Sequence, residues 1–280
     1  MEKGGITLFT NALLVYKPVE KCLEIANRIT SSLRIHGIPV HAISVDDLFT
    51  KRENEEALDF DLIVSIGGDG TFMKSAKYST FYSLILPYPC GKRNAYYEQG
   101  LPDPAKIVER VLKGDFYLEN IPLYQLCTGE TCKYFVNDAV FVSSDLGKVT
   151  KFKVTITSHT AETSMLFEGD GIIIASSHGS SGHNLSARGP LVMPDHESLI
   201  ITSLNPLQLG LPSIVAPPYS TVRIWVKNPT LLYADGEQLT LLKDNSVVEV
   251  KHGFRYVRVV RFREKRNIWR SIIEPRQCVF

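Results

Sequence analysis

The chain has 280 residues, of which 44% are hydrophobic and 22% are charged, and its formal net charge is +1. These values are typical of a globular protein with room for about two domains. A nearly neutral chain has no bulk attraction to nucleic acid or to an anionic membrane, and no apolar run approaches the ~18 residues of a membrane span. We therefore expect no nucleic-acid partner and no membrane span.

The first part of the chain alternates between strand-like and helix-like segments. Strands are predicted at 6–15, 38–43, 61–66 and 84–86. Helices are predicted at 18–36, 71–81 and 103–113, with a polar helical link at 46–57. Strands that alternate with helices in this way predict a parallel sheet with right-handed crossovers.

The pattern changes after about Gly114, where short β-rich runs follow one another between turn residues. They lie at 117–126, 133–142, 149–158, 171–175, 198–203, 221–226, 231–233 and 246–251. Such spacing predicts a β-sandwich or barrel. The end of the chain, 254–280, carries a basic cluster that is expected to be a solvated face, on a strand followed by a short helix near 268–273.

The expected fold class is therefore α/β plus all-β. A Rossmann-like parallel-sheet domain would occupy 1–115, and a β-sandwich domain for substrate binding would occupy 116–253. The segment 254–280 would pack back on the first domain.

The chain has five cysteines: Cys22, Cys90, Cys127, Cys132 and Cys278. Their odd number and scattered spacing argue against a disulfide framework and against a zinc site. The four residues between Cys127 and Cys132, Thr-Gly-Glu-Thr, are typical of the tip of a hairpin. The N-terminal residues lack the apolar core of a signal peptide, so we expect a cytoplasmic location.

The strand at 61–66 runs directly into Gly67-Gly68-Asp69-Gly70-Thr71. Glycines let the backbone come close to a ligand, and Thr71 is expected to be the N-cap of the next helix. Free N–H groups at a helix N-terminus bind anions, so we expect a phosphate here. Asp69 beside a phosphate is favourable only if it binds a metal ion or takes a proton from a hydroxyl. The alternative is an ordinary tight turn. The spacing is that of neither a Walker A loop nor the dinucleotide fingerprint.

Two further segments combine buried strands with polar residues. An apolar strand at 171–175 leads from Asp170 into a loop rich in Gly, Ser and His, which offers N–H and hydroxyl groups to a ligand or is a flexible surface loop. His178 and His183 in this loop have no Cys, Asp or Glu partner at metal-ligand spacing, so hydrogen bonding or stacking is expected. Asn137-Asp138 interrupts another apolar strand, and either closes a bulge or faces a ligand.

Taken in this order, the three segments resemble the NAD kinase family and, more distantly, the diacylglycerol and sphingosine kinases. Gly67–Thr71 matches the family's G-G-D-G-T motif, and Asn137-Asp138 stands where the family has Asn-Glu. Residues 170–171 and 179–190 are similar to its D-G and T-G-S-T-A-Y-S-L-S-A-G-G-P segments. Residues 205–207 and 233–237 are similar to its later C-P-H and V-D-G-Q segments. The resemblance covers about 6–265.

This resemblance implies a kinase that transfers a phosphoryl group from ATP, or sometimes polyphosphate, to the adenosine-ribose 2′-hydroxyl of NAD, giving NADP. It implies Mg²⁺, an active site between an α/β domain and a β-sandwich, and a homo-oligomer, either a dimer or a tetramer.

The resemblance also implies roles for individual residues. Asp69 would be the catalytic acid/base and would help to hold Mg²⁺, while Gly67, Gly68, Gly70 and Thr71 would bind the phosphates of ATP. The acceptor would be bound by Asn137, Asp138, Asp170, Ser181, Gly182 and His183.

The chain departs from the family pattern on the acceptor side. Residues 87–97 replace G-V-N-x-G-x-L-G-F, Gly182-His183 replaces Ala-Tyr, His178 replaces Thr, and Asp138 replaces Glu. Lys92 and Arg93 either meet a phosphate of the substrate or are solvated. Two alternatives therefore stay open beside NAD kinase activity. One is a kinase of the same fold that acts on another hydroxyl, of a sugar, polyol, nucleoside or lipid headgroup. The other is a non-catalytic nucleotide-binding regulator.

Overall fold

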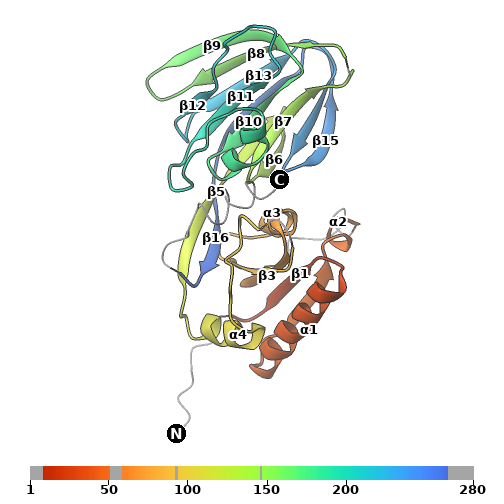
Figure 1. Ribbon diagram of the computed structural model, residues 1–280, viewed down its shortest axis with the longest axis vertical. Coiled ribbons are helices and arrows are strands. Elements are labelled where there is room, and N and C mark those ends of the chain that lie inside the picture. The colour runs from red at the N-terminus through yellow and green to blue at the C-terminus, as the bar shows by residue number, and fades with distance from the viewer. Residues whose placement is uncertain (1–8, 51–58, 92–93, 146, 264–280) are drawn as a thin grey trace, which may run out of the picture. The chain divides into compact units, whose positions relative to one another are not determined.

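The computed structural model describes residues 9–50, 59–91, 94–145 and 147–263 (Figure 1). The chain forms two compact units, one of residues 1–121 with 257–280 and one of residues 122–256. The boundaries between the units fall within two long strands, β5 (Tyr117–Thr128) and β16 (Val247–Arg261).

The first unit is an α/β structure around a parallel sheet. Its strands are β1 (Ala12–Tyr16), β2 (Val40–Ser44), β3 (Leu62–Gly67) and β4 (Leu84–Pro89), in the order β2-β1-β3-β4. Its helices are α1 (Glu20–Ile35), α2 (Asp47–Thr50), α3 (Asp69–Lys77) and α4 (Pro104–Leu112). The four strands are parallel, and the end of β16 adds to β4 in parallel, with Arg258 opposite Leu84.

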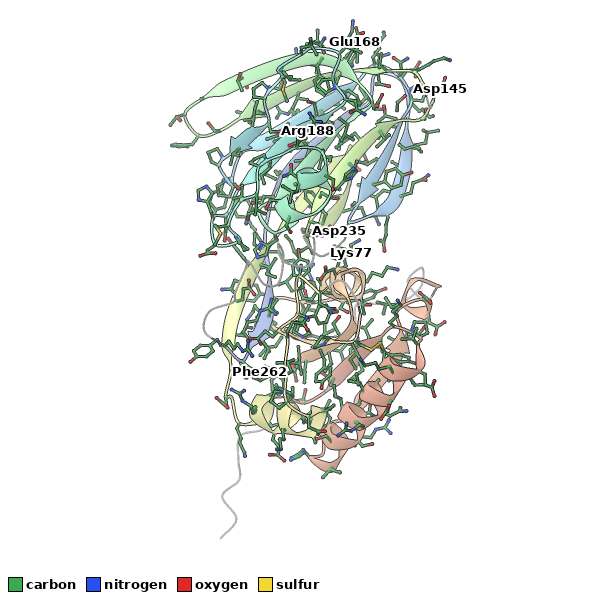
Figure 2. The ribbon with its side chains drawn as sticks, in the orientation of Figure 1. Lys77, Asp145, Glu168, Arg188, Asp235 and Phe262 are labelled. Atoms are coloured by element: carbon green, nitrogen blue, oxygen red, sulfur yellow. A yellow bond between two sulfur atoms is a disulfide. The ribbon has the colours of Figure 1, made fainter. Side chains whose placement is uncertain are left out.

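Helices α1 and α4 lie side by side and cover one face of this sheet (Figure 1). The buried residues of α1 recur every three or four positions, as an amphipathic helix requires: Cys22, Ala26, Ile29 and Leu33. Helix α4 begins where Asp103 accepts a hydrogen bond from the Ala105 N–H at 3.0 Å, with a proline in the first turn. The Arg110 guanidinium of α4 lies 4.7 Å from the ring centre of Phe262, which Figure 2 labels.

The second unit is a β-sandwich. Its strands, besides parts of β5 and β16, are β6 (Thr131–Phe135), β7 (Asp138–Ser143), β8 (Thr150–Thr157), β9 (Glu162–Gly169), β10 (Gly171–Ser176), β11 (Leu199–Leu204), β12 (Ile214–Ala216), β13 (Thr221–Val226), β14 (Thr230–Ala234) and β15 (Glu237–Leu242). One antiparallel sheet has the order β12-β11-β10-β7-β14-β15, and β16-β13-β8-β9 are paired in the other. The inward side chains of both sheets form one apolar core, which includes Phe141, Phe152 and Phe167.

The predicted fold class, a parallel-sheet α/β part followed by an antiparallel β part, is confirmed. The sequence does not predict strands β9, β12 and β15. Most residues of β9 and β15 are not buried, and β12 has only three residues, so the apolar pattern is weak in all three. The run predicted at 133–142 is two strands, β6 and β7, separated at Val136-Asn137. The predicted helix at 268–273 lies outside the described residues, as do residues 51–57 of the helical link.

The prediction that the cysteines form no disulfide framework is wrong for four of them. Cys22 at the start of α1 is bonded to Cys90 after β4, and Cys127 is bonded to Cys132. Spacing along the chain does not reveal the first bond, because it is the sheet that brings α1 next to the end of β4. The second bond joins directly opposed residues of β5 and β6, so the predicted hairpin tip is confirmed.

Among the described residues, no helix is long and apolar enough to cross a membrane.

The two disulfides should differ in their effect on stability. The Cys22–Cys90 bond closes a separation of 68 residues and the Cys127–Cys132 bond one of 5. Loop-closure entropy then predicts a loss of about 4 kcal/mol for Cys22→Ser and about 2 kcal/mol for Cys127→Ser. Urea unfolding of both variants and the wild type, with thiols counted in the denatured proteins, measures this difference. A wild type with five free thiols, or equal losses in the two variants, would contradict the assignment.

Candidate active site

The turn after β3 places a carboxylate at the N-terminus of a helix. Strand β3 ends at Gly67, Gly68 is the N-cap, and Asp69 is the first residue of α3. The prediction that Thr71 is the N-cap is therefore wrong; because the chain turns at Gly68, Thr71 already lies inside the helix, where it is buried. A Cβ atom added at Gly70 would meet nothing within 4 Å. The turn thus has an open side on which N–H groups of the helix N-terminus can bind an anion.

The segment after β4 packs tightly against this turn. The N–H groups of Cys90 and Gly91 both donate to the Gly67 carbonyl, at 2.9 and 2.8 Å. A Cβ atom on Gly91 would lie 2.9 Å from Gly68 Cα and 3.0 Å from Gly68 N, so only glycine fits this approach. The disulfide to Cys22 holds the same segment to α1.

Two tyrosines of this segment contact the turn directly. The Tyr96 N–H donates to Asp69 Oδ1 at 3.1 Å, and the Tyr97 hydroxyl donates to the Gly68 carbonyl at 3.0 Å. Both tyrosines are buried. The Asp69 carboxylate, which is itself half-buried, is therefore fixed by a residue 27 positions later in the chain.

In the second unit, polar groups gather at the start of β7. Asp235 lies in the turn between β14 and β15 (Figure 2), and its carboxylate accepts hydrogen bonds from the N–H groups of Val136 and Asn137 at 3.0 and 2.7 Å. The Asp235 N–H in turn donates to the Asp138 carbonyl at 2.9 Å. Asp235 has φ 51°, which Asp tolerates better than most residues and which Gly236 continues at φ 80°.

The loop after β10 closes on the same place. Ser176 Oγ donates to the Val136 carbonyl at 2.6 Å and accepts from the Gly179 N–H at 3.0 Å. A Cβ atom on Gly179 would lie 2.1 Å from the backbone carbonyl oxygen of Asn137, so only glycine fits this close approach. A short 3₁₀-helix η1 (His178–Ser181) and a short helix α5 (His183–Ser186) follow. We call Asn137, Asp138, Asp235 and η1 the acidic cluster.

Asn184 of α5 has a structural role in this loop. It is fully buried, donates to the carbonyls of Ser180 and Pro190, and accepts from the Thr202 hydroxyl at 2.7 Å. These bonds tie the loop to β11 and hold η1 against the sheet. The Gly, Ser and His residues here therefore lie on two short helices that are hydrogen-bonded to the sheet.

Burial raises the pKa of Asp138 to about 7, and the nearby Asp235 carboxylate contributes in the same direction. A buried carboxyl group with this pKa exchanges a proton near neutral pH, which is typical of functional sites.

The structure brings only some of the predicted site residues together. Gly67, Gly68, Asp69, Gly70 and Thr71 lie together in the first unit, at the end of β3 and in the first turn of α3. Asn137, Asp138, Ser181 and Gly182 lie together in the second unit, where a Cβ atom on Gly182 would lie 3.9 Å from Asp138 Oδ2. His178 is half-buried in η1, and His183 is exposed at the start of α5. Lys92 and Arg93 lie outside the described residues.

Asp170 lies at the opposite end of β10 from the acidic cluster. It precedes β10, whereas Asp138 pairs with Ala175 near the other end of that strand, on the order of 15 Å away at ~3.4 Å per residue. Asp170 is exposed and accepts a hydrogen bond from the Asn205 side chain at 2.8 Å.

Three residues of the site were not predicted. Asp235 has a sequence signal, since Asp-Gly between two strands is typical of a tight hairpin turn. Tyr96 and Tyr97 have none, because nothing in the local pattern says that their segment folds back on the turn at Asp69.

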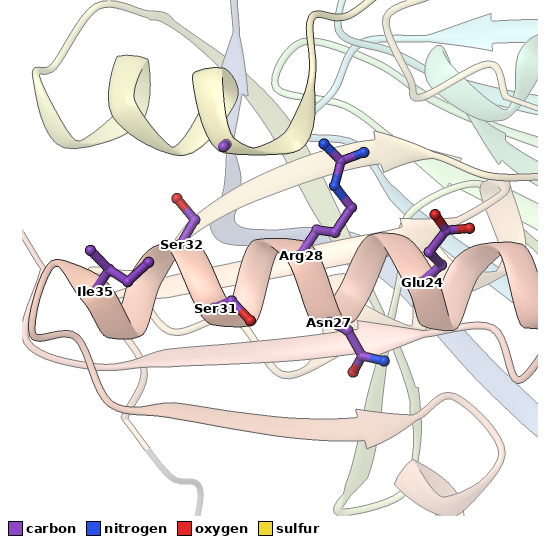
Figure 3. Close-up of a pocket in the computed structure, with 7 residues that line it drawn as sticks. Glu24, Asn27, Arg28, Ser31, Ser32 and Ile35 are labelled. Carbon is purple, nitrogen blue, oxygen red and sulfur yellow. The ribbon is translucent and has the colours of Figure 1, made fainter.

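An open pocket of about 440 Å³ lies elsewhere in the first unit, over the outer side of α1 (Figure 3). It is lined by Glu24, Asn27, Arg28, Ser31, Ser32, Ile35 and Ala105. Arg28 forms an ion pair with Asp103 at its edge. This pocket contains none of the predicted site residues, and we do not assign it a ligand.

The fold and the glycine turn define a class of protein: an α/β unit with an acid at the N-terminus of a helix, joined to a β-sandwich with an acidic cluster. Residues 136–262 match the family model of the ATP-NAD kinase C-terminal domain. NAD kinases of Thermococcus sibiricus and Clostridium perfringens are each 27% identical to the chain, over 259 and 262 residues. These alignments cover 88% and 90% of this chain, and 91% and 93% of the relatives.

Solved structures agree on the fold. An NAD kinase from Archaeoglobus fulgidus in complex with ATP matches with a TM-score of 0.74 and 19% identity, over 96% of this chain and 100% of that one. Yeast NADH kinase complexed with NADH matches with a TM-score of 0.80 and 18% identity, over 98% of this chain and 88% of that one. The resemblance to the NAD kinase family that the motifs predict is confirmed.

The raised pKa of Asp138 predicts a pH dependence of stability. The folded protein keeps this proton up to about pH 7, whereas the unfolded chain releases it near the ordinary pKa of 3.8. Asp138 therefore contributes stability below about pH 4 that is lost as the pH rises to about 7. Asp138→Asn should remove this contribution, so that its free energy of unfolding falls less steeply between pH 4 and 7. Urea unfolding of both proteins across this range measures it, and parallel curves would contradict the burial of an ionisable Asp138.

Proposed function

We propose that this protein is an ATP-dependent phosphotransferase that phosphorylates the adenosine-ribose 2′-hydroxyl of NAD to give NADP. The observation that carries the proposal is the Asp69 carboxylate, held at the N-terminus of α3 beside the open side of a glycine turn. Similarity to NAD kinases over about nine tenths of the chain supports the same activity.

Phosphoryl transfer requires bound phosphates, alignment of the attacking oxygen and a group that orients the hydroxyl or accepts its proton. Residues Gly67–Thr71 supply N–H groups for the phosphates of ATP. Asp69 orients the acceptor hydroxyl and takes its proton. The acceptor oxygen forms a bond to the γ-phosphorus as the bond from that phosphorus to the bridging oxygen breaks, and ADP leaves.

The acidic cluster would bind NAD. The Asn137 amide and the Asp138 carboxyl group are suited to ribose hydroxyls and to the edge of a base, since together they donate and accept hydrogen bonds. Ser181, Gly182 and His183 follow in the adjacent loop, where a hydroxyl, an N–H group and an exposed ring can hold the other half of the dinucleotide. On this proposal, the first unit binds the phosphates of ATP and the second unit binds the acceptor.

Mg²⁺ fits the proposed site through Asp69 and the phosphates of ATP, since Mg²⁺ is often bound by one or two carboxylates plus substrate phosphates. Within the described ranges, no group of three or more His, Cys, Asp or Glu residues is arranged to hold a metal by itself. When bound, the ion would neutralise charge on the transferred phosphoryl group. Polyphosphate as donor, a homo-oligomer and a cytoplasmic location stay predictions.

A kinase of the same fold for another hydroxyl compound is the second candidate. The observation that favours it is the segment 87–97, which departs from the family pattern although its residues Cys90, Gly91 and Tyr97 contact the turn directly. Purified protein with ATP and a panel of acceptors decides between the two. We expect NADP from NAD; brisk phosphorylation of a sugar, polyol, nucleoside or lipid headgroup, with no NADP, would contradict the first candidate.

Removal of the Asp69 carboxyl charge tests the role of the turn. Asp69→Asn should lower kcat for NADP formation by roughly 10²–10⁴-fold, because the group that accepts the proton is lost. Asp115→Asn is the matched control, since Asp115 is an exposed acid of the same unit that pairs with Arg110. Equal rates in Asp69→Asn and the wild type would rule out acid/base chemistry at the turn, and absence of turnover in both would favour a non-catalytic nucleotide-binding protein.

A further inference from the structure

We propose that Tyr97 is a positioning residue for phosphoryl transfer: its hydroxyl holds the Gly68 carbonyl and so fixes the Asp69 carboxylate that follows. This inference rests on the proposed function, in which the Asp69 carboxylate orients the acceptor hydroxyl.

The hydrogen bonds around Tyr97 have a defined direction. Its hydroxyl lies 3.0 Å from the Gly68 carbonyl oxygen and 3.1 Å from Ser65 Oγ. A carbonyl oxygen can only accept, so the single proton of the tyrosine points to Gly68, and Ser65 donates its own proton to the tyrosine oxygen. Ser65 belongs to β3, the strand that leads into the turn. The Tyr97 hydroxyl therefore links Ser65, which precedes Gly67, to Gly68, which follows it, through two hydrogen bonds.

The surroundings keep this phenol protonated and rigid. Tyr97 is 1% exposed, and burial raises its pKa far above the ordinary value, so the hydroxyl keeps its proton at neutral pH and can donate a hydrogen bond. The Phe72 ring of α3 contacts both tyrosines: it is stacked on Tyr96 with ring centres 4.3 Å apart and lies edge-on to Tyr97 at 6.4 Å. A loss of the hydroxyl leaves this aromatic packing in place.

The segment that carries Tyr97 is anchored from far away in the sequence. Arg261 Nη1 donates to the Tyr96 carbonyl at 2.7 Å, and Arg261 Nε donates to Glu119 at 2.6 Å. Glu98 accepts from the N–H groups of Phe262 and Arg263 at 2.8 and 3.1 Å. Arg261 is buried and the Glu119 side chain is partly exposed, so the guanidinium end of this ion pair is shielded from solvent. Tyr96 and Tyr97 are thus held by β5 and β16 on one side and hold the turn on the other.

Catalysis is sensitive to small displacements, since a misplacement of about 1 Å can cost on the order of 10²-fold in rate. Without the hydroxyl, the Gly68 carbonyl loses its donor and the Gly68–Asp69 peptide can rotate. Tyr97→Phe should therefore lower kcat by roughly 10-fold to 10²-fold, with the KM values for ATP and NAD changed by less than about twofold.

The test is a double-mutant cycle of NADP formation with Tyr97→Phe, Asp69→Asn and the double variant. If Tyr97 acts through Asp69, Tyr97→Phe costs nothing further once Asp69→Asn is present. Tyr88→Phe is the matched control, because the Tyr88 hydroxyl donates to the Pro102 carbonyl at 3.2 Å and its hydrogen bond does not involve the turn. An active wild type with full kcat in Tyr97→Phe, or with independent losses in the cycle, would overturn the proposal.

Amide hydrogen exchange provides a readout that does not depend on the reaction. Tyr97→Phe should speed exchange of the Tyr96 N–H, which donates to Asp69, by at least about tenfold, whereas Tyr88→Phe should leave it unchanged. Unchanged exchange in Tyr97→Phe would overturn the positioning role even if no acceptor is phosphorylated. Absence of turnover in the wild type, with faster exchange in the variant, would instead refute the proposed function alone.

Discussion

The contact on which the functional part of this structure depends is the approach of Gly91 to the turn at Gly67-Gly68. Two N–H groups, of Cys90 and Gly91, converge on the Gly67 carbonyl, and no side chain fits between the two backbone segments. This contact decides where the chain goes after β4. It leads Tyr96 and Tyr97 back to the turn, where they fix the Gly68 carbonyl and the Asp69 carboxylate. The end of β3 alone would leave this carboxylate on a short glycine turn with many accessible conformations.

The two units solve the same physical problem in different ways. Each must hold acidic groups, against their mutual repulsion and the cost of burial, in a place where a ligand can reach them. In the first unit the N–H groups of a helix N-terminus and of Tyr96 offset the charge of Asp69. In the second unit the Asp235 carboxylate receives backbone N–H groups, and Asp138 beside it stays protonated up to about pH 7. The two environments suit the two tasks proposed here: an acid at a helix N-terminus for proton transfer, and an acid with a pKa of about 7 for binding hydroxyl groups.

The sequence predicts the fold class and the elements that carry a strong period, such as α1 and β3, together with the glycine turn and the Asn137-Asp138 break. It does not predict features that depend on contacts between distant segments. Three such contacts are the Cys22–Cys90 disulfide, the hydrogen bond of Tyr97 to Gly68 and the hydrogen bond of Arg261 to Tyr96. Their residues are 68, 29 and 165 positions apart. Local propensity carries no information about such contacts. Asp235 is an intermediate case. Its hairpin turn is predictable, but the backbone N–H groups that donate hydrogen bonds to its carboxylate are not.

If the proposed function is correct, the backbone contact at Gly91 holds the turn in the geometry for phosphoryl transfer. The most direct measurement is the rate of NADP formation from ATP and NAD by Gly91→Ala, compared with the wild type at matched far-UV circular dichroism. An added Cβ atom would lie 2.9 Å from Gly68 Cα, so the turn must shift while both units keep their cores. We expect Gly91→Ala to fold and to have a kcat that is lower by about 10²-fold. A folded Gly91→Ala variant with the full wild-type rate would contradict it.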